Sequence, residues 1–146
     1  MLNQYSKKNL KIYLDIDGVL IDTKEYKPMP YLKEFLTTVF NISNGEVYWL
    51  STHTHDGDNT IPLNYFKPVV DRDVYLMLEK IKPSKWNSLK TEGIDLESDF
   101  LWFDDVIFQA EYNFLESVGK EHCLIKVKDN LEELVTLLKE DLHQED

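Results

Sequence analysis

Two pairs of acidic residues each stand at the end of an apolar run. Asp15 and Asp17 lie in "YLDIDGVL", and Asp104 and Asp105 lie in "LWFDDV". Asp15 and Asp17 are two residues apart, so their side chains point to one side wherever the chain is extended. Two carboxylates side by side at a buried strand end repel each other and lose hydration, so they need a cation. The pairs predict a cation site, although D-x-D-G alone is also compatible with a solvated turn.

A third polar segment, "STHTHDGDN" at 51–59, follows the apolar run "EVYWL". Two small hydroxyl residues come first, Ser51 and Thr52. Four potential metal ligands follow within six residues: His53, His55, Asp56 and Asp58.

Zinc sites usually recruit a further ligand from a distant segment. The other two histidines, His122 and His143, are expected near the opposite edge of the fold and in the terminal tail. The segment is therefore interpreted as a polar loop that faces substrate, with a dedicated zinc site as the alternative. Within it, His53 is a candidate substrate contact, and Asp58 and Asn59 are candidate caps of the next helix.

Short β-rich runs alternate with helical patterns along the chain, which is typical of an α/β fold. Strands are expected at 10–16, 46–51, 99–104 and 123–127, with 68–70 as a short extra strand. Most of these runs are nearly continuously apolar, as strands covered on both faces must be. They predict a three-layer, Rossmann-like parallel sheet with helices on both faces. Ligands of such folds bind outside the carboxyl ends of the strands.

Apolar residues at helical spacing predict one helix over 31–40 and another over 131–142. A further helix is expected over 107–118, ended by Gly119. Asp129 or Asn130 is expected to cap the last helix. The apolar faces of these helices are expected to form the core.

Length and charge limit the function classes. A chain of 146 residues is near the usual size of one domain, so a single domain over 1–146 is expected. The formal net charge of -11 disfavours strong non-specific binding to nucleic acid and to an anionic membrane. The single Cys123 cannot form an internal disulfide, which fits a reducing compartment. A soluble, cytoplasmic protein is expected, because the apolar stretch after Lys8 is too short for a signal peptide or a membrane span.

With a lysine between the hydroxyl and the last acidic pair, this order of motifs resembles the haloacid dehalogenase (HAD) superfamily of phosphohydrolases. The resemblance covers nearly the whole chain and rests on "YLDIDGVL", "VYWLST", a lysine in "IKPSKWNSLK" and "LWFDDV". Among its members, the chain is most similar to the small ones without a cap domain that are grouped with RNA-repair phosphatases.

The resemblance implies a Mg²⁺-dependent phosphatase that acts on a phosphomonoester through an aspartyl-phosphate. Asp15 would be the nucleophile, Asp17 the general acid and base, and Ser51 a hydrogen-bond donor to the phosphoryl oxygens. The Mg²⁺ ligands would be Asp15, the carbonyl of Asp17, Asp104 and Asp105. These roles suit phosphoryl transfer, which mostly needs alignment and neutralised charge.

The phosphate-facing lysine has three candidates. Lys85 is preferred because it opens an apparent helix, "SKWNSLK", nineteen residues before Asp104. Lys82 is the alternative, although the "KP" pair to which it belongs can end the preceding helix. Lys90 is interpreted as a solvated helix residue.

The spacing between the motifs leaves no segment for a cap domain, which implies an open site for a phosphorylated substrate of unknown class. A receiver-type signalling domain uses similar residues, but its phosphorylated aspartate ends a middle strand, whereas D-x-D comes first here. A non-catalytic phosphate-binding or regulatory module on the same fold is the other alternative. Such a module would be expected to lack one of the acidic motifs, and this chain keeps them all.

Overall fold

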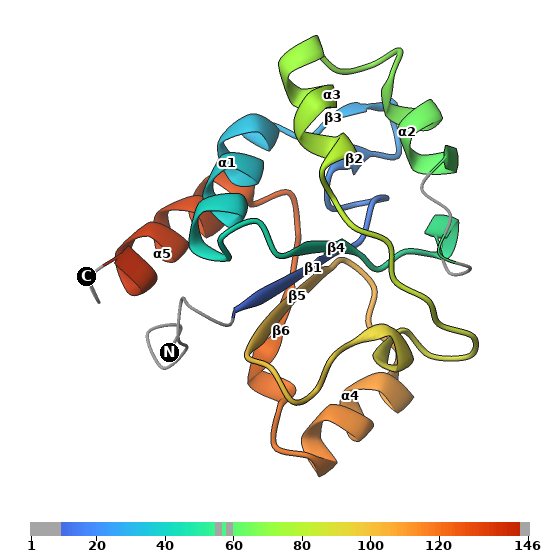
Figure 1. The fold of residues 1–146 in the computed structure, drawn as a ribbon, viewed down its shortest axis with the longest axis vertical. Helices are drawn as coiled ribbons and strands as arrows, with labels where there is room; N and C mark the ends of the chain where they lie inside the picture. Colours follow the sequence, from blue (N-terminus) through green and yellow to red (C-terminus); the bar gives the residue numbers. More distant parts are fainter. Residues whose placement is uncertain (1–9, 55–56, 58–59, 144–146) are drawn as a thin grey trace.

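A four-stranded parallel sheet forms the centre of the fold. The computed structural model describes residues 10–54, 57 and 60–143. The strands lie in the order β4 (Val47–Trp49), β1 (Lys11–Leu14), β5 (Phe100–Asp104) and β6 (Leu124–Lys126), all parallel (Figure 1). The segment at Lys82 adds a bridge outside β4, where the Trp49 N–H donates to the Lys82 carbonyl at 2.9 Å. The four predicted strands are confirmed, each shorter than expected.

Helices cover both sides of this sheet. Helices α1 (Leu32–Ile42) and α5 (Leu131–His143) pack against each other on one side, and α4 (Gln109–Ser117) lies on the other (Figure 1). Gly119 follows α4 with a φ of +73°, as expected of a glycine that ends a helix. The core joins the layers: the rings of Phe35 on α1 and Phe103 on β5 meet edge to face at 5.1 Å. The predicted layered α/β architecture is thus present.

Two further units lie beyond the edge of the sheet. A two-stranded antiparallel ribbon, β2 (Ile21–Asp22) and β3 (Lys27–Pro28), follows β1 directly. Helices α2 (Thr60–Phe66) and α3 (Arg72–Glu79) pack together near this ribbon (Figure 1). The ribbon was not predicted from the sequence, because each of its strands is only two residues long.

The strand expected at 68–70 is absent. The N–H groups of Val69 and Val70 both donate to the carbonyl of Phe66, at 2.9 and 3.1 Å. These bonds close a turn at the end of α2 and leave the two residues unable to pair as a strand. The apolar pair was therefore wrongly predicted as extended.

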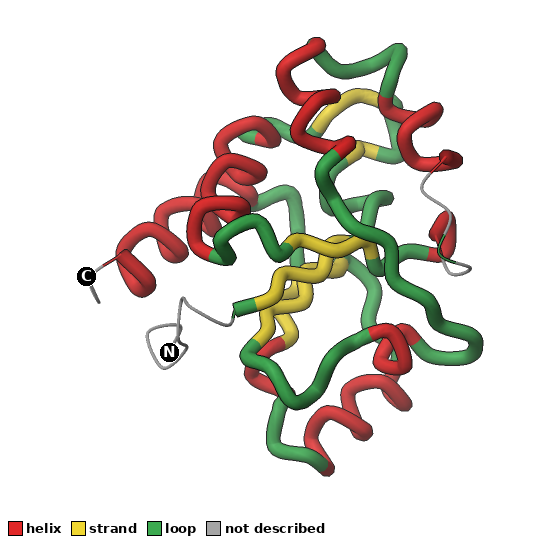
Figure 2. Tube along the Cα trace, in the orientation of Figure 1, coloured by secondary structure: helices red, strands yellow, loops and turns green. Residues whose placement is uncertain are grey.

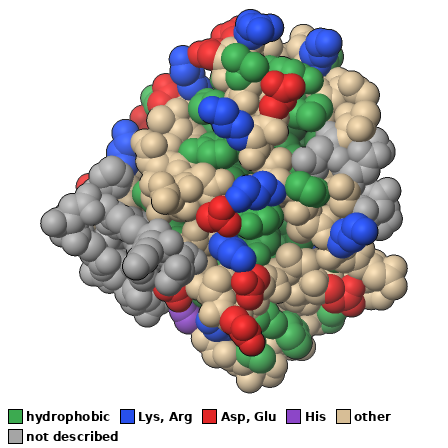
Figure 3. Space-filling view, in the orientation of Figure 1, with side chains coloured by type: hydrophobic (Ala, Val, Ile, Leu, Met, Phe, Trp, Pro, Cys, Tyr) green, Lys and Arg blue, Asp and Glu red, His purple; other side chains and the backbone are tan. Residues whose placement is uncertain are grey.

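The loops that leave β1, β4 and β5 gather at one end of the sheet, where the strands have their carboxyl ends (Figure 2). On the face shown in Figure 3, Lys and Arg side chains are interspersed with Asp and Glu and form no basic stripe. Within the described ranges, every helix is too short or too polar to cross a membrane.

Candidate active site

Three carboxylates converge at the carboxyl ends of the two central strands. Asp15, Asp104 and Asp105 each offer an oxygen atom, and these atoms lie within 4.8 Å of one another. The pairing of β1 with β5 brings them together, since the Asp15 N–H donates to the Phe103 carbonyl at 3.1 Å. Asp104 is fully buried and Asp15 is 8 % exposed. Both acidic motifs of the sequence therefore contribute to one cluster.

Burial and close packing raise the pKa values of two of these carboxyl groups. Burial, followed by the charge of Asp104, raises the pKa of Asp15 to about 8. Burial and the same neighbour also raise the pKa of Asp105. Without a metal ion, Asp15 therefore holds its proton more tightly than a free aspartic acid does. A metal ion bound in the cluster would favour the ionised form of Asp15.

The lysine of this cluster is Lys90. Its ammonium lies 2.7 Å from Oδ2 of Asp104 and 3.4 Å from Oδ1 of Asp15. Burial is the largest single influence on the Lys90 pKa and lowers it, but the two carboxylates together raise the pKa above its ordinary value. Lys90 is thus a buried cation with two acidic partners.

This position corrects the prediction made for the three lysines. Lys85 is exposed in an extended segment, where its side chain lies beside Gly57 and not in the acidic cluster. No helix forms over 84–89, so the helical argument for Lys85 was wrong. Lys82 instead bonds to Glu46 at the outer edge of the sheet. Lys90, interpreted as solvated, is only 9 % exposed.

A buried glutamate places Lys90. Glu111 on α4 accepts the Lys90 N–H at Oε2, at 2.9 Å, and the Phe108 N–H at Oε1, at 3.2 Å. It thereby ties the 3₁₀ helix η4 (Lys90–Gly93) to the start of α4. Sequence reasoning missed Glu111.

The helix predicted around Lys85 could have been doubted from the sequence. The pair Asn87–Ser88, which favours turns, argues against a helix before Lys90.

Gly18 and Asp105 are in close contact. A Cβ atom added to Gly18 would lie 1.9 Å from Oδ2 of Asp105, and Gly18 has a φ of +79°. Both observations require glycine at this position. The glycine of "DIDG" therefore makes room for the second acidic motif.

Ser51 and Thr52 occupy different places. Ser51 is 1 % exposed, and its Oγ accepts the His53 N–H at 3.1 Å. Its carbonyl accepts the Trp86 indole N–H at 3.2 Å. Thr52, the first residue of the 3₁₀ helix η3 (Thr52–Thr54), lines the cavity instead. Ser51 thus shapes the turn that presents Thr52, and is not itself part of the cavity wall.

The side chain of Asp17 stands apart from the three clustered carboxylates. Its Oδ2 lies 3.0 Å from Nε2 of His53. Its Oδ1 is buried and has no hydrogen-bond partner among the residues that the structure describes. His53 therefore contacts Asp17, and its predicted contact with substrate stays a prediction. The remaining predicted members of this loop, His55, Asp56, Asp58 and Asn59, lie outside the described residues.

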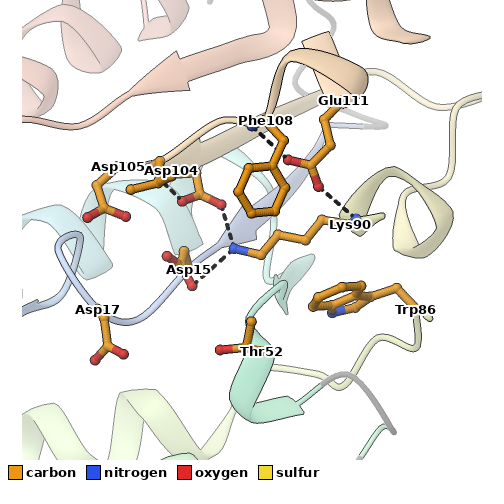
Figure 4. A pocket seen from close by; sticks show the side chains of 10 residues that line it. Asp15, Asp17, Thr52, Trp86, Lys90, Asp104, Asp105, Phe108 and Glu111 are labelled. Carbon is orange, nitrogen blue, oxygen red and sulfur yellow. Dashed lines mark hydrogen bonds and ion pairs between the residues drawn. The ribbon is translucent and has the colours of Figure 1, made fainter. Parts of the chain in front are cut away.

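These groups surround a cavity of about 260 Å³ (Figure 4). Its polar wall holds the carboxylates, Lys90 and Thr52, and its apolar wall holds Trp86, Val106 and Phe108. Phe108 and Val106 are 60 % and 59 % exposed, so they form an open apolar lip. A small anion could reach Lys90 and the acidic cluster only if a cation balances the carboxylates.

The donor set fits a hard cation. All three clustered groups are carboxylates, two of them buried, and carboxylate oxygens are ligands of hard cations. The cluster contains no histidine, and nothing in its composition favours zinc. Comparisons with protein-family models, curated proteins and solved structures found no match to this chain.

Proposed function

We propose that the chain is a Mg²⁺-dependent phosphohydrolase of the HAD type, which hydrolyses a phosphomonoester through an aspartyl-phosphate on Asp15. One observation carries the proposal. Asp15, Asp104 and Asp105 converge within 4.8 Å on a cavity that also contains the ammonium of Lys90. Carboxylates for a hard cation, a nucleophile and a fixed positive charge are the parts that phosphoryl transfer needs.

Asp15 and Asp17 would carry the two steps of the reaction. An Asp15 oxygen bonds to phosphorus as the bond to the leaving oxygen breaks, and Asp17 gives that oxygen a proton. Water then attacks the phosphorus of the acyl phosphate, Asp17 takes a proton from the water, and the Asp15 carboxylate is released with phosphate.

Lys90, together with a Mg²⁺ ion at the carboxylates, would neutralise the negative charge of the phosphoryl group. The Lys90 ammonium can offset charge on the phosphoryl oxygens, and the Thr52 hydroxyl, in place of Ser51, can donate to them. Mg²⁺ held by Asp15, Asp104, Asp105 and the carbonyl of Asp17 would supply the remaining positive charge. The buried ligands keep water away from this charge, which strengthens its effect.

The arrangement around the cavity supports an open site. In the described ranges, the intervals between the motifs form the β2–β3 ribbon, α1 and the α2–α3 pair, which supports a site without a separate cap domain. The apolar lip of Val106 and Phe108 supports a substrate with an apolar or planar group beside its phosphate. The net charge of -11 argues against a strong non-specific nucleic-acid binder.

The test is hydrolysis of an activated aryl phosphate by the wild-type chain and Asp15→Asn, with Mg²⁺ present. Asparagine keeps the shape of aspartate but cannot form an acyl phosphate, so the rate should fall by several orders of magnitude while the fold is kept. Equal rates would disprove the covalent route. A fold that binds Mg²⁺ and phosphate but hydrolyses no phosphomonoester would instead support the non-catalytic alternative.

A further inference from the structure

His53 contacts the carboxyl group of Asp17. The imidazole Nε2 lies 3.0 Å from Asp17 Oδ2. Tyr65, on α2, is a second neighbour of the imidazole, and its ring lies 5.8 Å from it. The imidazole therefore has the Asp17 carboxyl group and the Tyr65 ring as neighbours.

The backbone on both sides of this contact is fixed. The Asp17 backbone belongs to a tight turn, in which the N–H groups of Leu20 and Ile21 donate to the Ile16 carbonyl. The His53 backbone is held by Ser51, whose Oγ accepts its N–H at 3.1 Å. Only the side-chain torsions of Asp17 and His53 remain to be set, and their mutual hydrogen bond sets them.

We propose that His53 is a positioning residue that holds the Asp17 carboxyl apart from the Asp15–Asp104–Asp105 cluster, so that Asp17 serves the leaving group and not the metal. The inference rests on the proposed function. In this role His53 donates through Nε2, and the bonded oxygen of Asp17 can accept whether the carboxyl group is ionised or protonated. The side chain of Asp17 is 43 % exposed and faces the cavity in this position.

The physical need for such a holder comes from the charge of the cluster. A cation that draws three carboxylates together also attracts a fourth carboxylate two residues from Asp15. If Asp17 joined the metal ligands, it could no longer give a proton to the leaving oxygen. The hydrogen bond from His53 to Asp17 opposes that movement.

The test compares two substrates that differ in their need for a proton. An activated aryl phosphate leaves as a stable phenolate, whereas an alkyl phosphate needs a proton from the acid. His53→Ala should lower kcat/KM, which reports formation of the aspartyl-phosphate, by about tenfold or more for the alkyl phosphate and by less than about threefold for the aryl phosphate. His53→Gln should restore much of the loss, because its amide nitrogen can take the place of Nε2.

Two further measurements separate positioning from a general loss of structure. In an Asp17→Asn background, His53→Ala should cause no additional loss on the alkyl phosphate, because the two residues act as one unit. His122→Gln serves as the matched control, since His122 lies in η5 (Glu121–Cys123), at the amino end of β6. Its rates on both substrates should match the wild type.

The outcomes also separate this inference from the proposed function. Equal losses of kcat/KM on both substrates for His53→Ala, or full additivity with Asp17→Asn, would overturn the positioning role while Asp15→Asn still abolished activity. Retained activity in Asp15→Asn would overturn the proposed function itself. A selective loss on the alkyl phosphate, rescued by glutamine and absent in the Asp17→Asn background, is the result expected.

Discussion

The ammonium of Lys90 lies 2.7 Å from Oδ2 of Asp104, and both side chains are buried. Asp104 is further satisfied by the Trp102 indole N–H at Oδ2 and the Val106 N–H at Oδ1, both at 3.2 Å. Lys90 therefore offsets the charge of Asp104, while the other two donors hold Asp104 in place. The first prediction tests this division.

Lys90→Met should lower stability and activity together. Removing one partner of a buried ion pair typically costs about 3–5 kcal/mol, because the other charge is left unpaired. Aryl phosphatase activity should fall by about a hundredfold or more, as expected when an electrostatic contact to the transition state is lost. Urea unfolding and steady-state rates measure both effects. Lys85→Met is the matched control, and a larger effect at Lys85 would restore the original sequence-based prediction.

Mg²⁺ should stabilise the folded chain. Binding to the native state alone, at tenfold above the dissociation constant, adds about 1.4 kcal/mol and raises the melting temperature by roughly 2–6 °C. Thermal melts at constant ionic strength, with and without a chelator, measure the rise. Asp105→Ala should abolish it, and can raise the melting point of the metal-free chain by relieving repulsion. A larger rise with Zn²⁺ would instead favour the histidine-containing loop as the metal site.

Gly18→Ala should damage the site, whereas Gly45→Ala should not. Both glycines have a positive φ, +79° and +87°, so alanine costs about 1–2 kcal/mol at either position. Only at Gly18 does the new Cβ meet Asp105, whereas Gly45 has nothing within 4 Å. Gly18→Ala should therefore be the less stable variant and should lose the Mg²⁺-induced rise in melting temperature. Equal stability and equal Mg²⁺ response of the two variants would contradict the close contact.

The stability of the metal-free chain should depend on pH through Asp15. Its folded-state pKa of about 8 lies above the ordinary value of 3.8, so the folded chain holds this proton more tightly than the unfolded chain does. The contribution is fully present below pH 3.8 and is lost as the pH rises towards 8. Urea unfolding in the presence of a chelator should show wild-type stability falling with pH relative to Asp15→Asn. Parallel pH curves for the two proteins would show that Asp15 ionises normally.

Much of this site could be predicted from local patterns. The apolar runs ending in Asp15 and Asp104 placed both acidic motifs at strand ends, and parallel pairing brings such ends together. Lys90 could not be placed in this way. The backbone of Lys90 is held by Glu111, which is 21 residues away in the sequence. Local sequence patterns do not predict contacts between residues so far apart. The contact between His53 and Asp17 spans 36 residues and was equally invisible, although the loop beside the chemistry was expected.

The role of Ser51 shows a different limit. The sequence places two adjacent hydroxyls at the end of β4, and neighbouring residues of an extended chain point to opposite sides. Which of them faces the cavity depends on where the strand stops and the turn begins. The strand ends at Trp49, and the turn places Ser51 in the interior and Thr52 on the cavity wall. The strand ends two residues earlier than predicted, and the position of this end decides which hydroxyl faces the cavity.

The central claim is that Asp15 carries the phosphoryl group. The most direct measurement is borohydride reduction of Asp17→Asn after mixing with an aryl phosphate and Mg²⁺, followed by mass spectrometry of the peptides. Asp17→Asn should accumulate the intermediate, because the water that hydrolyses it has lost its base. Reduction converts an aspartyl-phosphate into homoserine. Homoserine is expected at position 15, dependent on substrate and Mg²⁺ and absent from the Asp15→Asn, Asp17→Asn double variant. Unmodified Asp15 in Asp17→Asn, from a preparation whose wild-type chain turns over the same substrate, would contradict it.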